Sequence, residues 1–119
     1  MTAIIYHNPR CSKSRQALEL LRERGIEPHI VEYLKTPPDA ATLRGLLRSL
    51  GCPARDLLRR GEEAYAALGL AARLDDDAAL IAAMVEHPVL IERPVIVVGE
   101  RAVIGRPPGK LLALLEDAG

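Results

Sequence analysis

Residues 8–15, Asn-Pro-Arg-Cys-Ser-Lys-Ser-Arg, place a cysteine where a turn passes into an expected helix. The first N–H groups of a helix have no partner within it, and the helix dipole is positive there, so this position favours a thiolate at Cys11. The same features bind anions. Arg10, Lys13 and Arg15 add positive charge nearby. The segment therefore predicts a nucleophilic sulfur beside a place for an oxyanion, the alternative being a small cysteine packed in a tight turn.

The Cys-x-x-Ser spacing restricts the redox chemistry. A second cysteine three residues on could close a local disulfide, whereas Ser14 cannot. The other cysteine, Cys52, stands beside Pro53, and we expect it to be a packed residue at a helix start. A phosphatase loop of the form Cys-x5-Arg is excluded, because the required arginine is replaced by Ala17. Any second thiol must therefore come from Cys52 or from another molecule.

Three of the 13 arginines stand at expected ends of helices or strands: Arg59 after two leucines, Arg93 before a proline and Arg106 between a glycine and a proline. Arginine binds oxyanions with two parallel hydrogen bonds and keeps its charge. Side chains at such ends can reach into a cleft, and for each of them a solvated surface charge is the alternative. Position alone does not select these three.

The histidines give weaker signals. His7 closes the first expected strand near Cys11, where it could tune the thiol, and a packed imidazole is an equal alternative. The spacing of histidines and cysteines does not resemble a metal site. We therefore expect no metal.

Composition limits the class of protein. The 119 residues carry 16 basic and 16 acidic side chains, and 49% are hydrophobic. This length and apolar content predict one folded domain. The zero net charge disfavours coating of nucleic acid. No apolar run approaches the ~20 residues of a membrane span, and no signal peptide is visible, so a cytoplasmic protein with no membrane partner is expected.

Patterning predicts the elements that must position these residues. Beta-branched runs predict strands at 3–7, 29–34, 94–98 and 101–104, and apolar stripes predict helices at 12–24, 39–50, 53–58, 62–68, 75–85 and around 111–115. Asp39 and Gly51 are typical helix caps, and Gly99 suits a two-residue hairpin turn. The order is β-α-β, a helical insertion at about 37–88, then β-β-α. It predicts a single α/β domain over residues 1–119 with a mixed sheet.

Four segments together, residues 6–15, 57–59, 92–97 and 105–107, resemble the glutaredoxin-coupled arsenate reductase (ArsC-like) family, in particular its short-chain members. The resemblance covers nearly the whole chain in the same order. It implies a thioredoxin-like fold with an inserted helical segment. It also implies a cis peptide bond between Arg93 and Pro94.

The resemblance implies a function as well. Cys11 would be the nucleophile, the oxyanion would be held by Arg59, Arg93 and Arg106, and the thiolate would be tuned by His7 and Ser14. Arsenate would be reduced to arsenite through an arsenic–sulfur adduct. No cofactor would be bound: glutathione would act as co-substrate, and glutaredoxin would reduce the mixed disulfide.

Two alternatives remain open on the sequence. One is a general glutathione-linked thiol oxidoreductase that acts on another oxyanion or on a mixed disulfide. The other is a non-enzymatic regulator similar to the Spx-like proteins, which bind RNA polymerase and commonly carry Cys-x-x-Cys. Ser14 argues against a local redox switch of that kind.

Overall fold

The computed structural model describes residues 2–118, and the chain divides into two compact units. The first, here the sheet unit, comprises residues up to Thr36 together with residues from Arg93 onward; the second, the helical unit, comprises Pro37–Glu92. The helical unit corresponds to the insertion expected at about 37–88 and runs on to Glu92. That the two units form one domain stays a prediction.

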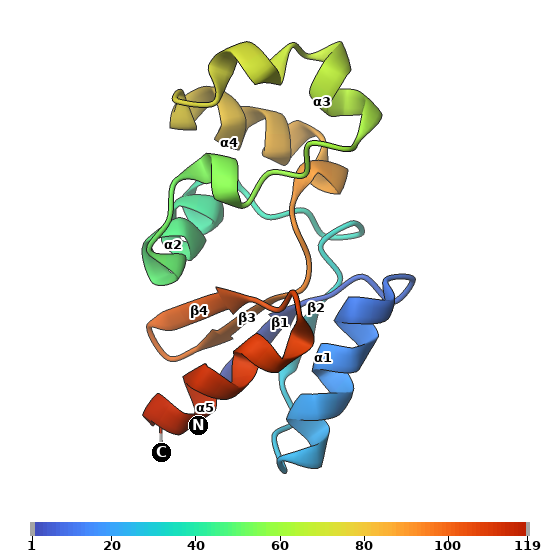
Figure 1. Ribbon diagram of the computed structural model, residues 1–119, viewed down its shortest axis with the longest axis vertical. Helices are drawn as coiled ribbons and strands as arrows, with labels where there is room; N and C mark the ends of the chain where they lie inside the picture. The colour runs from blue at the N-terminus through green and yellow to red at the C-terminus, as the bar shows by residue number, and fades with distance from the viewer. Residues whose placement is uncertain (1, 119) are drawn as a thin grey trace. The chain divides into compact units, whose positions relative to one another are not determined.

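The sheet unit is built on four strands, β1 (Ala3–Tyr6), β2 (His29–Val31), β3 (Val95–Val98) and β4 (Arg101–Ile104), in the order β2-β1-β3-β4 (Figure 1). β1 and β2 are parallel, whereas β1 with β3 and β3 with β4 are antiparallel. The helix α1 (Ser12–Glu23) connects β1 to β2, and α5 (Leu111–Ala118) follows β4. The mixed α/β sheet expected from the sequence is confirmed.

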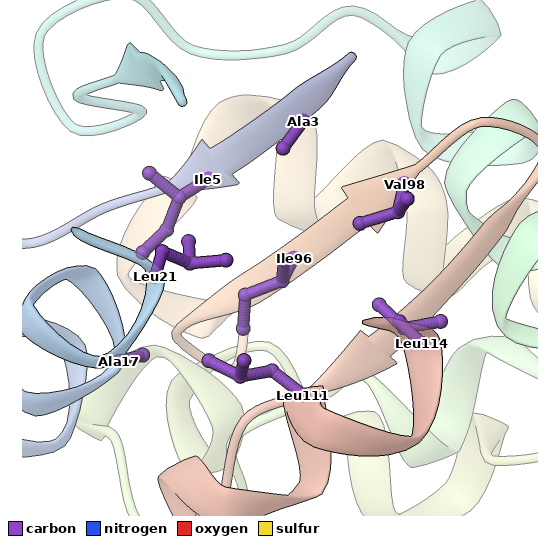
Figure 2. Close-up of a cluster of buried hydrophobic side chains, with 8 residues drawn as sticks. All are labelled: Ala3, Ile5, Ala17, Leu21, Ile96, Val98, Leu111 and Leu114. Carbon is purple, nitrogen blue, oxygen red and sulfur yellow. The ribbon is translucent and has the colours of Figure 1, made fainter. Parts of the chain in front are cut away.

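The core of the sheet unit explains why these segments pair. The register places Ala3 opposite Val98 and Ile5 opposite Ile96, so the four side chains share one face of the sheet. They pack against two residues from each of the helices α1 and α5 (Figure 2): Ala17, Leu21, Leu111 and Leu114. Burying one large aliphatic side chain of this kind stabilises a fold by about 1.5–3 kcal/mol. The helices α1 and α5 therefore pack on the same face of the sheet.

The second strand is shorter than its sequence predicts. The strand expected at 29–34 is present but wrong in extent, because β2 ends at Val31. The carbonyl of Glu32 accepts hydrogen bonds from the N–H groups of Lys35 at 2.9 Å and Thr36 at 3.0 Å, so the chain turns there. This turn overrides the strand preference of the residues between them.

The hairpin of β3 and β4 follows its turn residues. Gly99 has φ of 61°, which matches the predicted two-residue turn with glycine first. The strand β3 begins at Val95, one residue later than expected. Pro94 lacks the N–H group that a strand residue donates.

The helical unit contains α2 (Ala40–Leu50), α3 (Glu63–Ala67) and α4 (Asp77–Glu86). The predicted caps of α2 are confirmed: the Asp39 carboxylate accepts from the N–H of Thr42 at 2.8 Å, and Gly51 adopts φ of 68°. The helix expected at 53–58 is wrong in extent, since only a 3₁₀ turn at Ala54–Asp56 forms. Two further 3₁₀ turns, Leu70–Arg73 and Pro88–Leu90, were not expected. Among the helices of residues 2–118, none has the length and hydropathy to cross a bilayer.

Candidate active site

A tight turn places Cys11 at the beginning of α1. The N–H of Cys11 donates to the Asn8 carbonyl at 2.9 Å, and the N–H of Arg10 donates to Asn8 Oδ1 at 3.0 Å. Cys11 is the N-cap residue of α1, as expected, and its free thiol is partly exposed. Arg15 Nη1 donates to the Pro9 carbonyl at 2.9 Å, in the same turn, and its effect on the sulfur stays a prediction. The hydrogen bonds to Asn8 therefore fix the backbone of the turn at Cys11.

One predicted arginine lies beside the sulfur. Arg106 Nη1 lies 3.8 Å from Cys11 Sγ, and the same nitrogen donates to the Arg93 carbonyl at 3.2 Å. Arg106 follows β4, and Arg93 precedes β3. The hairpin thus brings the Arg93 and Arg106 segments together at the end of the sheet. A fixed positive charge beside the thiol attracts an anion to it.

Both arginines precede prolines in cis peptide bonds, Arg93–Pro94 and Arg106–Pro107. The first bond was implied by the resemblance and is confirmed. The second was not anticipated, and the only sequence signal for it is the repeated Arg-Pro dipeptide.

The other two predicted residues of the sheet unit form a buried pair. His7 Nδ1 and Ser14 Oγ lie 2.6 Å apart, and the same hydroxyl oxygen accepts from the N–H of Asn8 at 3.0 Å. The two residues are 6% and 0% exposed, respectively. Among the described residues, the hydrogen bonds of this pair run to each other and to Asn8 rather than to Cys11. A tuning effect on the thiol therefore stays a prediction.

Burial lowers the pKa of His7 below its ordinary value of 6.5. The negative charge of Glu32 opposes this shift, and the positive charges of Arg22 and Arg15 add to it. The imidazole is therefore neutral at pH 7, with one ring nitrogen able to accept a hydrogen bond.

Arg59 belongs to the helical unit. Leu58 and Ile91 form an antiparallel β-bridge, which places the Arg59 and Glu92 segments side by side. Arg59 Nε lies 3.2 Å from Glu62 Oε1, and Arg59 Nη1 lies 3.5 Å from Glu92 Oε1. Sequence reasoning did not select these two glutamates. Arg59 lies outside any helix, so no helical pairing pattern marks its contact with Glu62, and its contact with Glu92 depends on the β-bridge. The role of Arg59 with an oxyanion stays a prediction.

Cys52, also in the helical unit, is a free and partly exposed thiol. Partial burial raises its pKa, and the nearby charges of Asp56 and Asp77 raise it further. Cys52 therefore remains a thiol at neutral pH, which makes it a poor nucleophile. Within residues 2–118, no three His, Cys, Asp or Glu side chains are grouped so as to hold a metal ion.

The parallel β-α-β segment, the antiparallel β-β-α segment and the cysteine at the start of α1 define the class: a thioredoxin-like α/β protein. The chain belongs to the ArsC family, whose model matches residues 6–114.

Relatives of known sequence and structure extend along almost the full chain. It is 54% identical to the uncharacterized protein YfgD of Escherichia coli (strain K12) over 112 residues, which span 93% of this chain and 94% of that protein. A Neisseria meningitidis serogroup B protein named arsenate reductase is 46% identical over 93% of this chain and 96% of its own. The solved structure of an arsenate reductase from Vibrio cholerae matches with a TM-score of 0.92 at 46% identity, covering 95% of this chain and 97% of that one.

Proposed function

We propose that this protein reduces arsenate to arsenite, with Cys11 as the nucleophile and with glutathione and glutaredoxin as the external reductants. The observation that carries the proposal is the 3.8 Å distance between Arg106 Nη1 and Cys11 Sγ at the N-terminal end of α1. Two sequence relatives and a structural neighbour from different bacteria bear the name arsenate reductase, which supports the same substrate.

The chemistry requires a sulfur nucleophile and a cation at one place. The Cys11 thiolate attacks the arsenic atom of dihydrogen arsenate and forms a sulfur–arsenic bond. One arsenate hydroxyl takes the proton of the other and leaves as water. Arg106 offsets the charge of the arsenate oxygens as the thiolate approaches, because the guanidinium is fixed by the Arg93 carbonyl before substrate arrives. Arg93 lies at the same end of the sheet, and we assign it to the same oxyanion.

The reduction needs two thiols, because arsenic(V) gains two electrons to become arsenic(III). The glutathione thiolate attacks the Cys11 sulfur and forms a disulfide bond. The electron pair of the sulfur–arsenic bond stays with arsenic, which leaves as arsenite. Glutaredoxin then reduces the mixed disulfide between Cys11 and glutathione. Ser14 stands where a local resolving cysteine would lie, and the raised pKa of Cys52 makes it a poor nucleophile, so both observations favour an external thiol.

The decisive experiment measures NADPH oxidation with purified protein, arsenate, glutathione, glutaredoxin and glutathione reductase. We expect turnover that depends on arsenate and is abolished in Cys11→Ser. Because sulfur and oxygen are similar in size, the variant should keep the unfolding midpoint of the wild type. Absence of turnover in the wild type, with Cys11 shown to be reduced, would reject arsenate as the substrate.

Two further measurements separate the alternatives. Reduction of a glutathione mixed disulfide without any dependence on arsenate would indicate a general thiol oxidoreductase. Co-purification with RNA polymerase that is unaffected by Cys11→Ser would indicate a regulator instead.

A further inference from the structure

We infer that Gly105 is a positioning residue for Arg106, and that the site holds its cation beside Cys11 only because residue 105 has no side chain. The inference deepens the proposed function and rests on it for its consequence for turnover. Three residues of the sheet unit next to Gly105 carry the argument: Pro94, Ile96 and Arg106.

Gly105 makes a close approach that other residues cannot make. A Cβ atom at this position would lie 2.8 Å from Ile96 Cδ1 and 3.0 Å from Pro94 Cγ. Neither neighbour has room to withdraw easily. Ile96 is 0% exposed and belongs to the core cluster with α1 and α5 (Figure 2). The Pro94 ring has no freely rotating end. The restriction is one of space, because the backbone of Gly105 does not adopt a positive φ.

The backbone of Gly105 sets the path of the chain into Arg106. The β3–β4 register pairs Val95 with Ile104, so Pro94 and Gly105 are the next opposite pair. Proline has no N–H, and the pair therefore makes the single bond available to it: the N–H of Gly105 donates to the Pro94 carbonyl at 2.8 Å. The N–H of Arg106 then donates to the Ile104 carbonyl at 2.9 Å, which closes a three-residue turn centred on Gly105.

This arrangement links a backbone contact to the charge at the thiol. The turn directs Arg106 so that one guanidinium nitrogen reaches both the Arg93 carbonyl and Cys11 Sγ. A methyl group at 105 would push the end of β4 away from Pro94, and the guanidinium would move with it. Gly105 therefore acts on the sulfur and on the oxyanion through Arg106, without contacting either of them.

The test compares Gly105→Ala with the wild type in two alkylation reactions of Cys11. Iodoacetate carries a negative charge and iodoacetamide does not, while both consume the same thiolate. We follow both reactions by mass spectrometry of the Cys11 peptide and divide the iodoacetate rate by the iodoacetamide rate. This ratio reports the local positive charge, because the fraction of Cys11 present as thiolate affects both rates equally. We expect the ratio to fall by about fivefold in Gly105→Ala, as for loss of one unit charge some 4 Å away in a wet site.

Gly109→Ala is the matched control, because a Cβ at Gly109 would meet nothing within 4 Å. Its ratio should equal that of the wild type. An unchanged ratio in folded Gly105→Ala would overturn the inference and leave arsenate reduction untouched. Failure of arsenate turnover in the wild type would reject the proposed function, and the alkylation result would still stand.

A second variant covers loss of folding in Gly105→Ala. In Ile96→Val/Gly105→Ala the Cδ1 atom is absent, and the contact with Pro94 Cγ at 3.0 Å remains. We expect this double variant to fold with a ratio about twofold below that of Ile96→Val alone, since part of the displacement and hence of the charge loss persists. A ratio equal to that of Ile96→Val would overturn the inference.

Discussion

The hydroxyl of Ser14 lies 2.6 Å from His7 Nδ1, and both side chains are buried. Because the same oxygen accepts the N–H of Asn8 at 3.0 Å, one side chain joins the end of β1, the turn before Cys11 and the first turn of α1. Ser14 thus connects the segments that hold the cysteine. The hydrogen bond between His7 and Ser14 therefore has a structural role, which stability measurements can test separately from any effect on the thiol of Cys11.

Ser14→Ala removes this connection. The buried Nδ1 of His7 and the partly buried N–H of Asn8 would then lose their partner, which costs about 1–3 kcal/mol of stability. Urea denaturation followed by circular dichroism measures the loss. Ser12→Ala is the matched control, since Ser12 is an exposed residue of the same helix and should change stability by less than about 0.5 kcal/mol. Equal effects of the two substitutions would contradict the buried network.

The lowered pKa of His7 predicts how stability depends on pH. Burial is the main cause of the shift, so the native state binds a proton on His7 less readily than the unfolded chain does. Stability attributable to this group is therefore full above its ordinary value of 6.5 and falls as the pH is lowered through and below that value. Urea titrations between pH 5 and 8 should show the decrease.

His7→Gln should flatten this pH dependence, because glutamine does not titrate in this range. His29→Gln is the control for replacing a histidine of the same unit, because His29 is exposed on β2. A wild-type slope in His7→Gln would show that another group controls stability below pH 7.

Local signals in the sequence predicted the parts of the fold that local forces decide. The Asp39 cap, the Gly51 end of α2 and the Gly99 turn each depend on a few neighbouring residues, and each is confirmed. The predicted end of β2 was wrong because the chain turns at Glu32, whose carbonyl accepts three hydrogen bonds from Lys35 and Thr36. Strand propensity does not predict such a turn, because it describes single residues and not the hydrogen bonds that compete with strand pairing.

The candidate site divides in the same way. The position of Cys11 at the start of α1 follows from sequence, since a turn and a helix are local. The contact of Arg106 with Cys11 joins residues 95 positions apart. It depends on the pairing of β3 with both β1 and β4, which sequence patterns do not reveal. The need for glycine at 105 is likewise invisible in sequence, because it depends on where Pro94 and Ile96 lie across the hairpin.

Cys52 provides a test of the external-thiol scheme. Its pKa is raised by burial and by Asp56 and Asp77, so the thiolate that a resolving cysteine needs is scarce at neutral pH. We expect Cys52→Ala to retain at least about half of the wild-type kcat/KM in the glutathione-coupled assay, a change of well under 1 kcal/mol in the barrier. Loss of turnover in Cys52→Ala would indicate that Cys52, and not an external thiol, forms the disulfide with Cys11. Mass spectrometry of the oxidised protein would then show Cys11 bonded to Cys52 instead of to glutathione.

Arg59 is held between two carboxylates, and this sets what its substitution should do. Glu62 and Glu92 oppose the attraction of its charge for an anion. If Arg59 binds the oxyanion, Arg59→Ala should raise the KM for arsenate by about tenfold, the equivalent of one charge-assisted hydrogen bond. Glu62→Gln should lower that KM by about twofold or more, because it removes one competing charge and keeps the shape of the side chain.

Glu63→Gln is the matched control for the carboxylate. Glu63 is the neighbouring acidic residue, is exposed, and begins α3, so its replacement changes the net charge equally without touching the ion pairs of Arg59. Steady-state kinetics at low and high salt separates the two effects, since a general charge effect is screened and a contact is not. Equal KM values for Glu62→Gln and Glu63→Gln, together with a wild-type KM in Arg59→Ala, would assign Arg59 to the internal ion pairs of the helical unit. In that case Arg93 and Arg106 would be left to bind the oxyanion.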